Sequence, residues 1–311
     1  MAHGHRRAIL AAFFANLGIA VAKFVAFFAT GAASMLAEAV HSVADTGNQL
    51  LLLLGEARAV RDPTPEHPFG YGRERYFWAF VVALVLFSLG SLFAIAEGVE
   101  KLRHPHELVS PAWAVGVLVV AIVFEGFSLR TAVREADRVR GGQGWWSYVR
   151  HAKSPELPVV LLEDIGALVG LCFALFGVGL AAAFDEPRYD ALGSIAIGAL
   201  LGAIAWVLAV EMKSLLIGEA ASPKVRAAIR DTAETTPGVE RVIHMRTLHL
   251  GPDELLVALK LALDPGLDLP DVAAAIDAVE HRVRARVPSA RVMYVEPDVY
   301  RDRAEAVARP D

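Results

Sequence analysis

Polar side chains that could bind a metal share one face of an apolar segment near the start of the chain. The stretch LAEAVHSVADTGNQLLLLLG spans residues 36–55. Its polar residues are Glu38, His41, Asp45, Asn48 and Gln49, at spacings of three, four, three and one. On a helix these spacings form a single stripe in which His41 and Asp45 lie one turn apart. That separation is a usual way for a helix to offer two metal ligands.

A second apolar segment, VVLLEDIGALVG, carries the adjacent acids Glu163 and Asp164. If the two segments pack together, His41, Asp45 and Asp164 converge, with Glu163 or water as a fourth ligand. One imidazole with carboxylates suits Zn²⁺, and also Fe²⁺, Co²⁺ or Mn²⁺, whereas the lack of a thiolate argues against Cu⁺. A lone aspartate or histidine could be purely structural, but ionisable groups inside a span are functional hypotheses by default.

Further polar residues of the apolar segments have less definite roles. Glu38, Asn48 and Gln49 are predicted to hold the ligands in place or to line the path of the metal. Asn16 shares a helix face with Lys23, seven residues later, and is assigned the same kind of role. Lys23 itself either neutralises an acid or reaches toward the membrane surface.

Two other acids and two glycine pairs also lie in the apolar segments. Glu97 and Glu125 either line the same cavity or lie near an interface. The glycine pairs are spaced four residues apart, which predicts close helix packing rather than ligand binding. They are Gly166 with Gly170 and Gly198 with Gly202.

The elements that must position these residues are membrane helices. The chain has 311 residues, of which 55% are hydrophobic, and its mean hydropathy is +0.44, too apolar for an ordinary soluble domain. Its net charge of −5 gives no argument for nucleic-acid binding, and its single cysteine excludes an internal disulfide framework. A span needs about 20 mostly apolar residues. Six segments qualify, at residues 8–30, 33–55, 76–99, 111–130, 158–183 and 190–216.

The basic residues of the connecting loops predict the orientation of these spans. Twelve Lys and Arg residues lie before residue 8 and in the loops 56–75 and 130–157, against three in the loops on the other side. Both termini are therefore expected in the cytoplasm or its organellar equivalent. The glycine-rich loop 141–151 holds Trp145 and Trp146, which we interpret as interfacial anchors.

Residues 219–311 are predicted to form a separate soluble domain after a transport domain of residues 1–218. Charges become frequent after Gly218, and the apolar runs shorten. The pattern indicates a helix, two strands, a second helix and a third strand, at residues 222–236, 239–250, 254–263, 270–287 and 290–296. This order fits a small open-faced α/β sandwich with its helices on one face of the sheet.

Several motifs resemble the cation diffusion facilitator family of divalent-metal/proton antiporters. They are ASMLAEAVHSVADTGNQ at 33–49, EHPFGYGRERYF at 66–77, the acid pair at 163–164 and IHMRTLHLG in the tail. The resemblance covers nearly the whole chain and implies six spans, cytoplasmic termini and a tail with a ferredoxin-like, metallochaperone fold that serves as a dimerisation module. It also implies a homodimer in the lipid bilayer whose protomers alternate between inward- and outward-facing states.

The chain departs from the common family pattern at the metal site. That pattern has two acids on the second span and a histidine with an acid on the fifth. Here His41 replaces the first acid, and Val160 stands where the fifth-span histidine is expected. The HSxxD and LLED motifs are similar to the zinc-transporter branch that includes mitochondrial members, so zinc is the favoured metal.

The peripheral metal positions of the family are only partly kept. His67 matches a loop ligand, but Thr64 stands where its acidic companion is expected. In the tail, His244 and Glu296 match ligand positions, whereas Lys260 occupies another. Because an ammonium group repels a cation, the usual two-metal site of the tail is predicted to be absent or impaired.

The sequence therefore predicts a zinc efflux transporter of the bacterial inner membrane, working by proton antiport and alternating access, with no cofactor and no enzymatic activity. Transport of Mn²⁺, Fe²⁺ or Co²⁺ is one alternative. Another is a metal sensor or scaffold that moves no metal, and a third is an intramembrane metalloenzyme. The chain has no HExxH motif, which argues against the enzyme.

Overall fold

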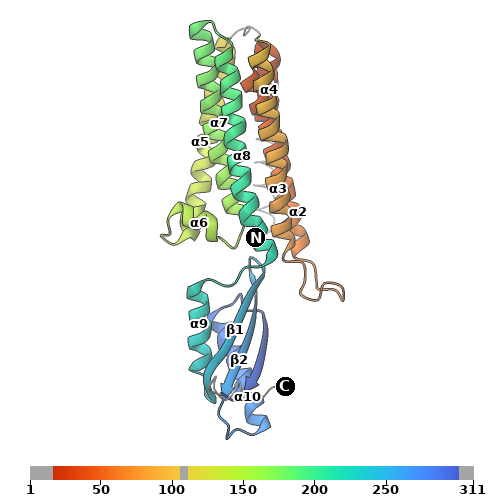
Figure 1. Ribbon diagram of the computed structural model, residues 1–311, viewed down its shortest axis with the longest axis vertical. Coiled ribbons are helices and arrows are strands. Elements are labelled where there is room, and N and C mark those ends of the chain that lie inside the picture. The colour runs from red at the N-terminus through yellow and green to blue at the C-terminus, as the bar shows by residue number, and fades with distance from the viewer. Residues whose placement is uncertain (1–16, 106–110, 301–311) are drawn as a thin grey trace. The chain divides into compact units, whose positions relative to one another are not determined.

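A computed structural model describes residues 17–105 and 111–300, which form two compact units (Figure 1). One unit holds the described residues up to Arg58 and Glu74–Lys213. The other holds Ala59–Arg73 together with the chain from Ser214 onward. The loop after the second predicted span thus groups with the tail, although it lies far from it in sequence. The domain division predicted at residues 218 and 219 stays a prediction.

The first unit is a bundle of long helices that run alongside one another (Figure 1). Among the residues that the structure describes, four helical stretches are long and apolar enough to cross a membrane: Glu74–Arg103, Pro111–Arg140, Glu156–Phe184 and Arg188–Ile217. The helices of this unit are Leu17–Thr30, α2 (Ala33–Ala59), α3 (Glu74–Val85), the π-helix η1 (Leu86–Ser91), α4 (Leu92–Arg103), α5 (Pro111–Arg140), α6 (Trp145–His151), α7 (Glu156–Phe184) and α8 (Arg188–Ile217).

The helices differ in two places from what the sequence predicts. α5 extends ten residues past the predicted end at residue 130, where paired charges such as Arg138 with Glu135 support a polar helix. The short helix α6 occupies much of the loop predicted at 141–151, and the Arg140 guanidinium lies 4.3 Å from the Trp145 ring centre. Hydropathy predicts the apolar span, but it does not predict polar helical residues that follow the span.

The beginning of α2 is fixed by a buried ion pair. The Asp190 carboxylate of α8 accepts hydrogen bonds from the backbone N–H of Ala33, at 2.8 Å, and of Ser34, at 3.3 Å. It also pairs with the Lys101 ammonium of α4 at 2.9 Å. A carboxylate at a helix N-terminus satisfies otherwise unpaired N–H groups. The polar stripe of α2 therefore starts from a point tied to α4 and α8.

The tail follows the predicted order of helices and strands. Its three strands lie in the order β1-β2-β3, with β1 antiparallel and β3 parallel to β2. Alternate residues of β2, such as Leu255 and Val257, are buried with Ile229 of α9 and Val279 of α10, so both helices pack on one face of the sheet. The elements are α9 (Pro223–Glu234), β1 (Val239–Gly251), β2 (Glu254–Leu263), α10 (Leu269–Arg286) and β3 (Val292–Asp298).

Candidate metal site

Carboxylates from three helices line a small cavity in the membrane unit. It holds about 20 Å³, enough for roughly one water-sized particle. Asp45 comes from α2, Glu125 from α5, and Glu163 and Asp164 from α7. The remaining lining residues are Ile19, Ser42, Gln49 and Val160. Four acids therefore border one small space inside the helix bundle.

Neighbouring helices hold two of these carboxylates in place. The Asn48 amide of α2 donates a hydrogen bond of 2.7 Å to Oε1 of Glu163. The Ser128 hydroxyl of α5 donates one of 3.1 Å to Oδ2 of Asp164. Asn48 thus orients the Glu163 carboxylate, and its role in positioning a metal ligand stays a prediction. Ser128 was not predicted, although it lies one turn from Glu125 on the same helix face and could have been found by that spacing.

His41 and Asp45 keep polar atoms without hydrogen bonds. His41 is 0% exposed, and neither ring nitrogen makes a hydrogen bond within the described residues. Its Nδ1 lies 3.4 Å from Oδ1 of Asp45, which likewise makes no hydrogen bond there. Because an unsatisfied buried polar group is costly, these atoms are candidates for binding a ligand.

The structure does not gather the predicted ligands into one cluster. No group of three or more His, Cys, Asp or Glu residues in the described ranges is placed to hold a metal ion. Asp45, Glu163 and Asp164 share the cavity, whereas His41 does not line it. α2 and α7 are joined by the Asn48–Glu163 hydrogen bond and belong to one buried apolar cluster, to which Ala37 contributes from α2. The four-residue ligand set stays a prediction.

Glu38 is bound to a cation beside the cavity. Lys23 of the helix Leu17–Thr30 donates a hydrogen bond of 3.1 Å to Oε2 of Glu38 and one of 2.7 Å to the Ser42 hydroxyl. Of the two roles open to Lys23, the structure shows neutralisation of an acid. Asn16 lies outside the described residues. Glu97 is half-buried and does not line the cavity.

The predicted peripheral metal ligands contact other side chains of the protein. His67 lies in an exposed loop with its ring 4.7 Å from that of Tyr71. Nε2 of His244 accepts a hydrogen bond of 3.0 Å from Arg246. Glu296 forms an ion pair of 3.0 Å with Lys260.

Lys260 is held as a cation in the tail. Its ammonium also pairs with Asp298 at 3.0 Å. Hydrogen bonds to Glu296 and Asp298 raise the pKa of Lys260 above its ordinary value. Since a protonated amine cannot bind a metal, Lys260 competes with any cation for these two carboxylates.

Comparison with known families assigns both parts of the chain. Residues 9–217 match the cation efflux transmembrane domain, and residues 221–297 match the cytoplasmic domain of cation efflux proteins, named as a dimer domain.

Known proteins resemble the chain over most of its length. A human protein, "Proton-coupled zinc antiporter SLC30A9, mitochondrial", is 35% identical over 231 residues, which are 74% of this chain and 41% of that protein. The mouse protein of that name is 34% identical with the same coverage. The chain thus spans about two fifths of the length of these relatives. "Cation-efflux pump FieF" of Serratia proteamaculans is 28% identical over 87% of this chain and 85% of its own.

A solved structure of the MamM CTD also matches part of the chain. It is 23% identical, covers 25% of this chain and 96% of its own, and has a TM-score of 0.24.

Proposed function

The chain belongs to the cation efflux family, as its motifs predict, and we propose that it is a transporter that exchanges a divalent metal, with zinc favoured, for protons. Membership makes it a multi-pass membrane protein with a helical transmembrane domain and a cytoplasmic-type αββαβ domain, and places it in a class of transporters rather than enzymes. The names of its relatives, a proton-coupled zinc antiporter and a cation-efflux pump, support metal as cargo.

The observation that carries the proposal is the cavity of Asp45, Glu125, Glu163 and Asp164 beside the unpaired imidazole of His41. Carboxylates and one imidazole bind zinc and the neighbouring first-row divalent metals. A cargo site must hold its ion loosely enough to release it. A few mixed ligands on separate helices meet that requirement better than a closed cage.

Proton exchange follows from the ligand chemistry. Carboxylates and imidazole must be deprotonated to bind metal, so metal and protons compete for the same atoms. We propose that α2 and α7 rearrange around the ion, so that His41, already 3.4 Å from Asp45, joins the carboxylates of α7. Asn48 and Ser128 then keep the two α7 carboxylates directed at the cavity. Helix rearrangement that opens the site to the other side of the membrane lets protons displace the metal.

Flux measurements test this proposal. Purified protein in proteoliposomes with an imposed pH gradient is assayed with Zn²⁺, Mn²⁺, Fe²⁺ and Co²⁺, for wild type and Asp45→Ala. The proposal expects gradient-dependent uptake of zinc that Asp45→Ala abolishes. Absence of uptake of any metal by folded protein would reject transport and favour the sensor or scaffold alternative.

The assembly and orientation are also proposals. The match of residues 221–297 to a dimer domain supports a homodimer. The excess of Lys and Arg in one set of loops supports cytoplasmic termini. A bacterial inner membrane remains our prediction for its location, whereas the human and mouse relatives are named as mitochondrial. Labelling of single cysteines placed in the tail of membrane-embedded protein tests the orientation.

A further inference from the structure

A buried lysine–glutamate pair adjoins the metal cavity. The side chains of Lys23 and Glu38 are 1% and 0% exposed, and their charged atoms lie 3.1 Å apart. The same ammonium nitrogen contacts the hydroxyl of Ser42, which lines the cavity. On α2, Glu38, Ser42 and Asp45 follow one another at four and three residues, along one helix face. One cation thus lies in contact with both Glu38 and the cavity wall.

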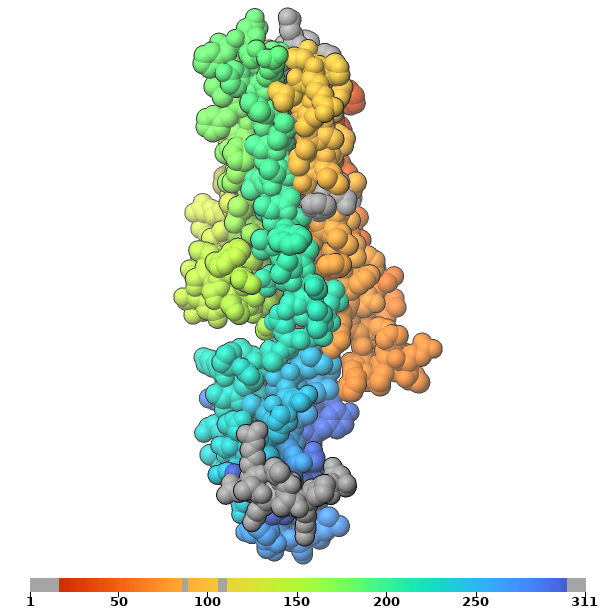
Figure 2. Space-filling model, in the orientation of Figure 1, coloured from red at the N-terminus to blue at the C-terminus, as the bar shows by residue number. Residues whose placement is uncertain are grey.

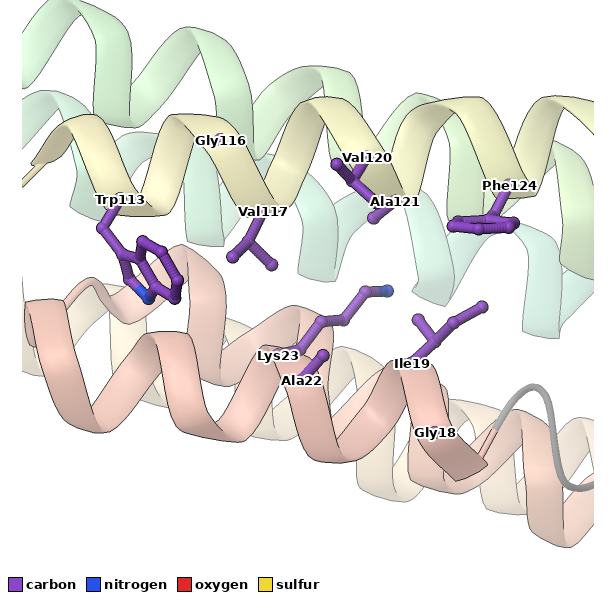
Figure 3. Close-up of a pocket in the computed structure, with 10 residues that line it drawn as sticks. All are labelled: Gly18, Ile19, Ala22, Lys23, Trp113, Gly116, Val117, Val120, Ala121 and Phe124. Atoms are coloured by element: carbon purple, nitrogen blue, oxygen red, sulfur yellow. The ribbon is translucent and has the colours of Figure 1, made fainter.

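The other side of Lys23 is apolar. Figure 3 shows Lys23 and Ile19 on the helix Leu17–Thr30, opposite Val117 and Phe124 of α5. They line a groove of about 680 Å³. The other residues of the groove are Gly18, Ala22, Trp113, Gly116, Val120 and Ala121, so its lining offers Lys23 no second carboxylate. In such a low-dielectric setting the attraction of the ammonium to Glu38 is strong.

The fold keeps a space for the Glu38 carboxylate. A Cβ atom added at Gly170 of α7 would lie 2.6 Å from Oε1 of Glu38, so any side chain there would displace the carboxylate. This oxygen makes no hydrogen bond within the described residues. Glu38 therefore has one oxygen bound to Lys23 and a second oxygen that is buried and free to accept a ligand.

We propose that Lys23 withholds Glu38 from the transported metal and thereby favours zinc over Mn²⁺. Without the lysine, Glu38 would add a carboxylate to a site that already has several. Additional carboxylates suit Mn²⁺, which prefers oxygen ligands, more than zinc, which binds well to imidazole. Lys23 is thus a residue that sets metal specificity without touching the metal. This inference rests on the proposed metal-binding function of the cavity.

The test compares the affinities of Zn²⁺ and Mn²⁺ for purified full-length protein, measured by equilibrium binding. Lys23→Gln removes the charge but keeps a hydrogen-bond donor, and Lys23→Met removes both. We expect each to raise the affinity for Mn²⁺ relative to zinc by about tenfold, the lower end of the effects of residues that support metal ligands. Adding Glu38→Gln to Lys23→Met should return the ratio to the wild-type value, because no carboxylate is then released.

A matched control exists in the same unit. Lys101 and Asp190 form another buried pair, 2.9 Å apart and 4% and 0% exposed, and neither residue lines the cavity. Lys101→Met therefore removes a buried lysine without freeing a carboxylate at the site. It should leave the Zn²⁺ to Mn²⁺ affinity ratio unchanged. An equal change of the ratio in Lys101→Met and Lys23→Gln would overturn the proposal, since general loosening would then explain both.

The outcomes also separate this inference from the proposed function. If wild type binds zinc and exchanges it for protons, but Lys23→Gln leaves the affinity ratio unchanged, the role of Lys23 is rejected and transport stands. If wild type neither binds nor moves a divalent metal, both are rejected. If Lys23→Met fails to fold, two other variants still test the role of Lys23. They are Lys23→Gln and the double variant, which leaves no unpaired charge because it is neutral at both positions.

Discussion

The cavity of the membrane unit and the tail sheet both gather acidic side chains, but they differ in what those acids contact. In the tail, Glu296 and Asp298 are each 3.0 Å from the Lys260 ammonium. At the cavity, Oδ1 of Asp45 makes no hydrogen bond within the described residues, and the nearby His41 imidazole makes none either. The acids of the tail have a resident cation, whereas the cavity keeps atoms that a transient cation can use.

This difference separates structural acids from ligand-binding acids. A carboxylate paired with lysine or arginine at a surface adds little stability and gains nothing from a metal. A buried donor or acceptor without a partner carries a desolvation penalty that a bound ligand or water can relieve. Whether buried polar atoms have hydrogen-bond partners therefore says more about the place of the metal site than the number of acids in either region.

The largest expected effect is on the cavity acids. Asp45→Ala or Asp164→Ala should lower zinc flux by about a hundredfold or more, because loss of a ligand exceeds the 10–100-fold cost of losing a supporting residue. Flux in proteoliposomes measures it. The matched control is Asp137→Ala, an exposed acid of α5 paired with Arg140, which should keep wild-type flux. Wild-type flux in either cavity variant would contradict the assignment.

A smaller effect is expected when a supporting residue is removed. Asn48→Ala deletes the 2.7 Å hydrogen bond that orients Glu163 and should weaken zinc binding by about tenfold. Equilibrium binding to the full-length protein provides the measurement. Ser128→Ala gives a parallel case at Asp164. If both variants bind zinc as wild type does, these hydrogen bonds do not position ligands.

A substitution in the tail should create a metal site where wild type has a lysine. His244, Lys260 and Glu296 lie in register across the three strands, so their side chains share one face of the sheet. Lys260→His would replace the resident cation with a second imidazole beside Glu296. The variant should bind more zinc per chain than wild type, as counted by metal analysis after dialysis. Lys260→Ala is the control and should show no gain.

The smallest expected effect concerns the stability of the tail. The contribution of Lys260 to that stability should not change with pH near neutrality. The pKa of Lys260 is raised by Glu296 and Asp298, so the stability it contributes is complete below the unfolded value, about 10.4, and is lost as pH rises through the folded value. The difference in unfolding temperature between wild type and Lys260→Ala should be constant from about pH 7 to 9. A difference that shrinks as pH rises within this window would mean that Lys260 loses its proton there, which would contradict its raised pKa.

Hydropathy and residue spacing predict most of the fold. The order of elements in the tail follows from strand alternation and from turns such as the one before β1. The stripe on α2 follows from helical periodicity, and Asp45, Glu163 and Asp164 do share a cavity. The order of elements and the stripe depend on neighbours along one segment, which a single sequence contains. The shared cavity was expected only on the condition that the two segments pack together.

Other features that depend on partners distant in sequence were not predicted. Nothing in the spacing pairs Lys101 with Asp190, 89 residues apart, or assigns Lys23 to Glu38 rather than to another acid. The polar continuation of α5 and the helix α6 were missed because hydropathy marks only the span. The position of His41 outside the cavity depends on how α2 packs against the neighbouring helices, which no local pattern encodes.

X-ray absorption at the zinc edge of the zinc-loaded full-length protein would test most directly where the metal binds. If the cavity is the site, the spectrum shows one imidazole with oxygen ligands in wild type and loses the imidazole in His41→Ala. It stays unchanged in His244→Ala. A spectrum that survives His41→Ala and changes in His244→Ala would place the metal in the tail and contradict the assignment of the cavity.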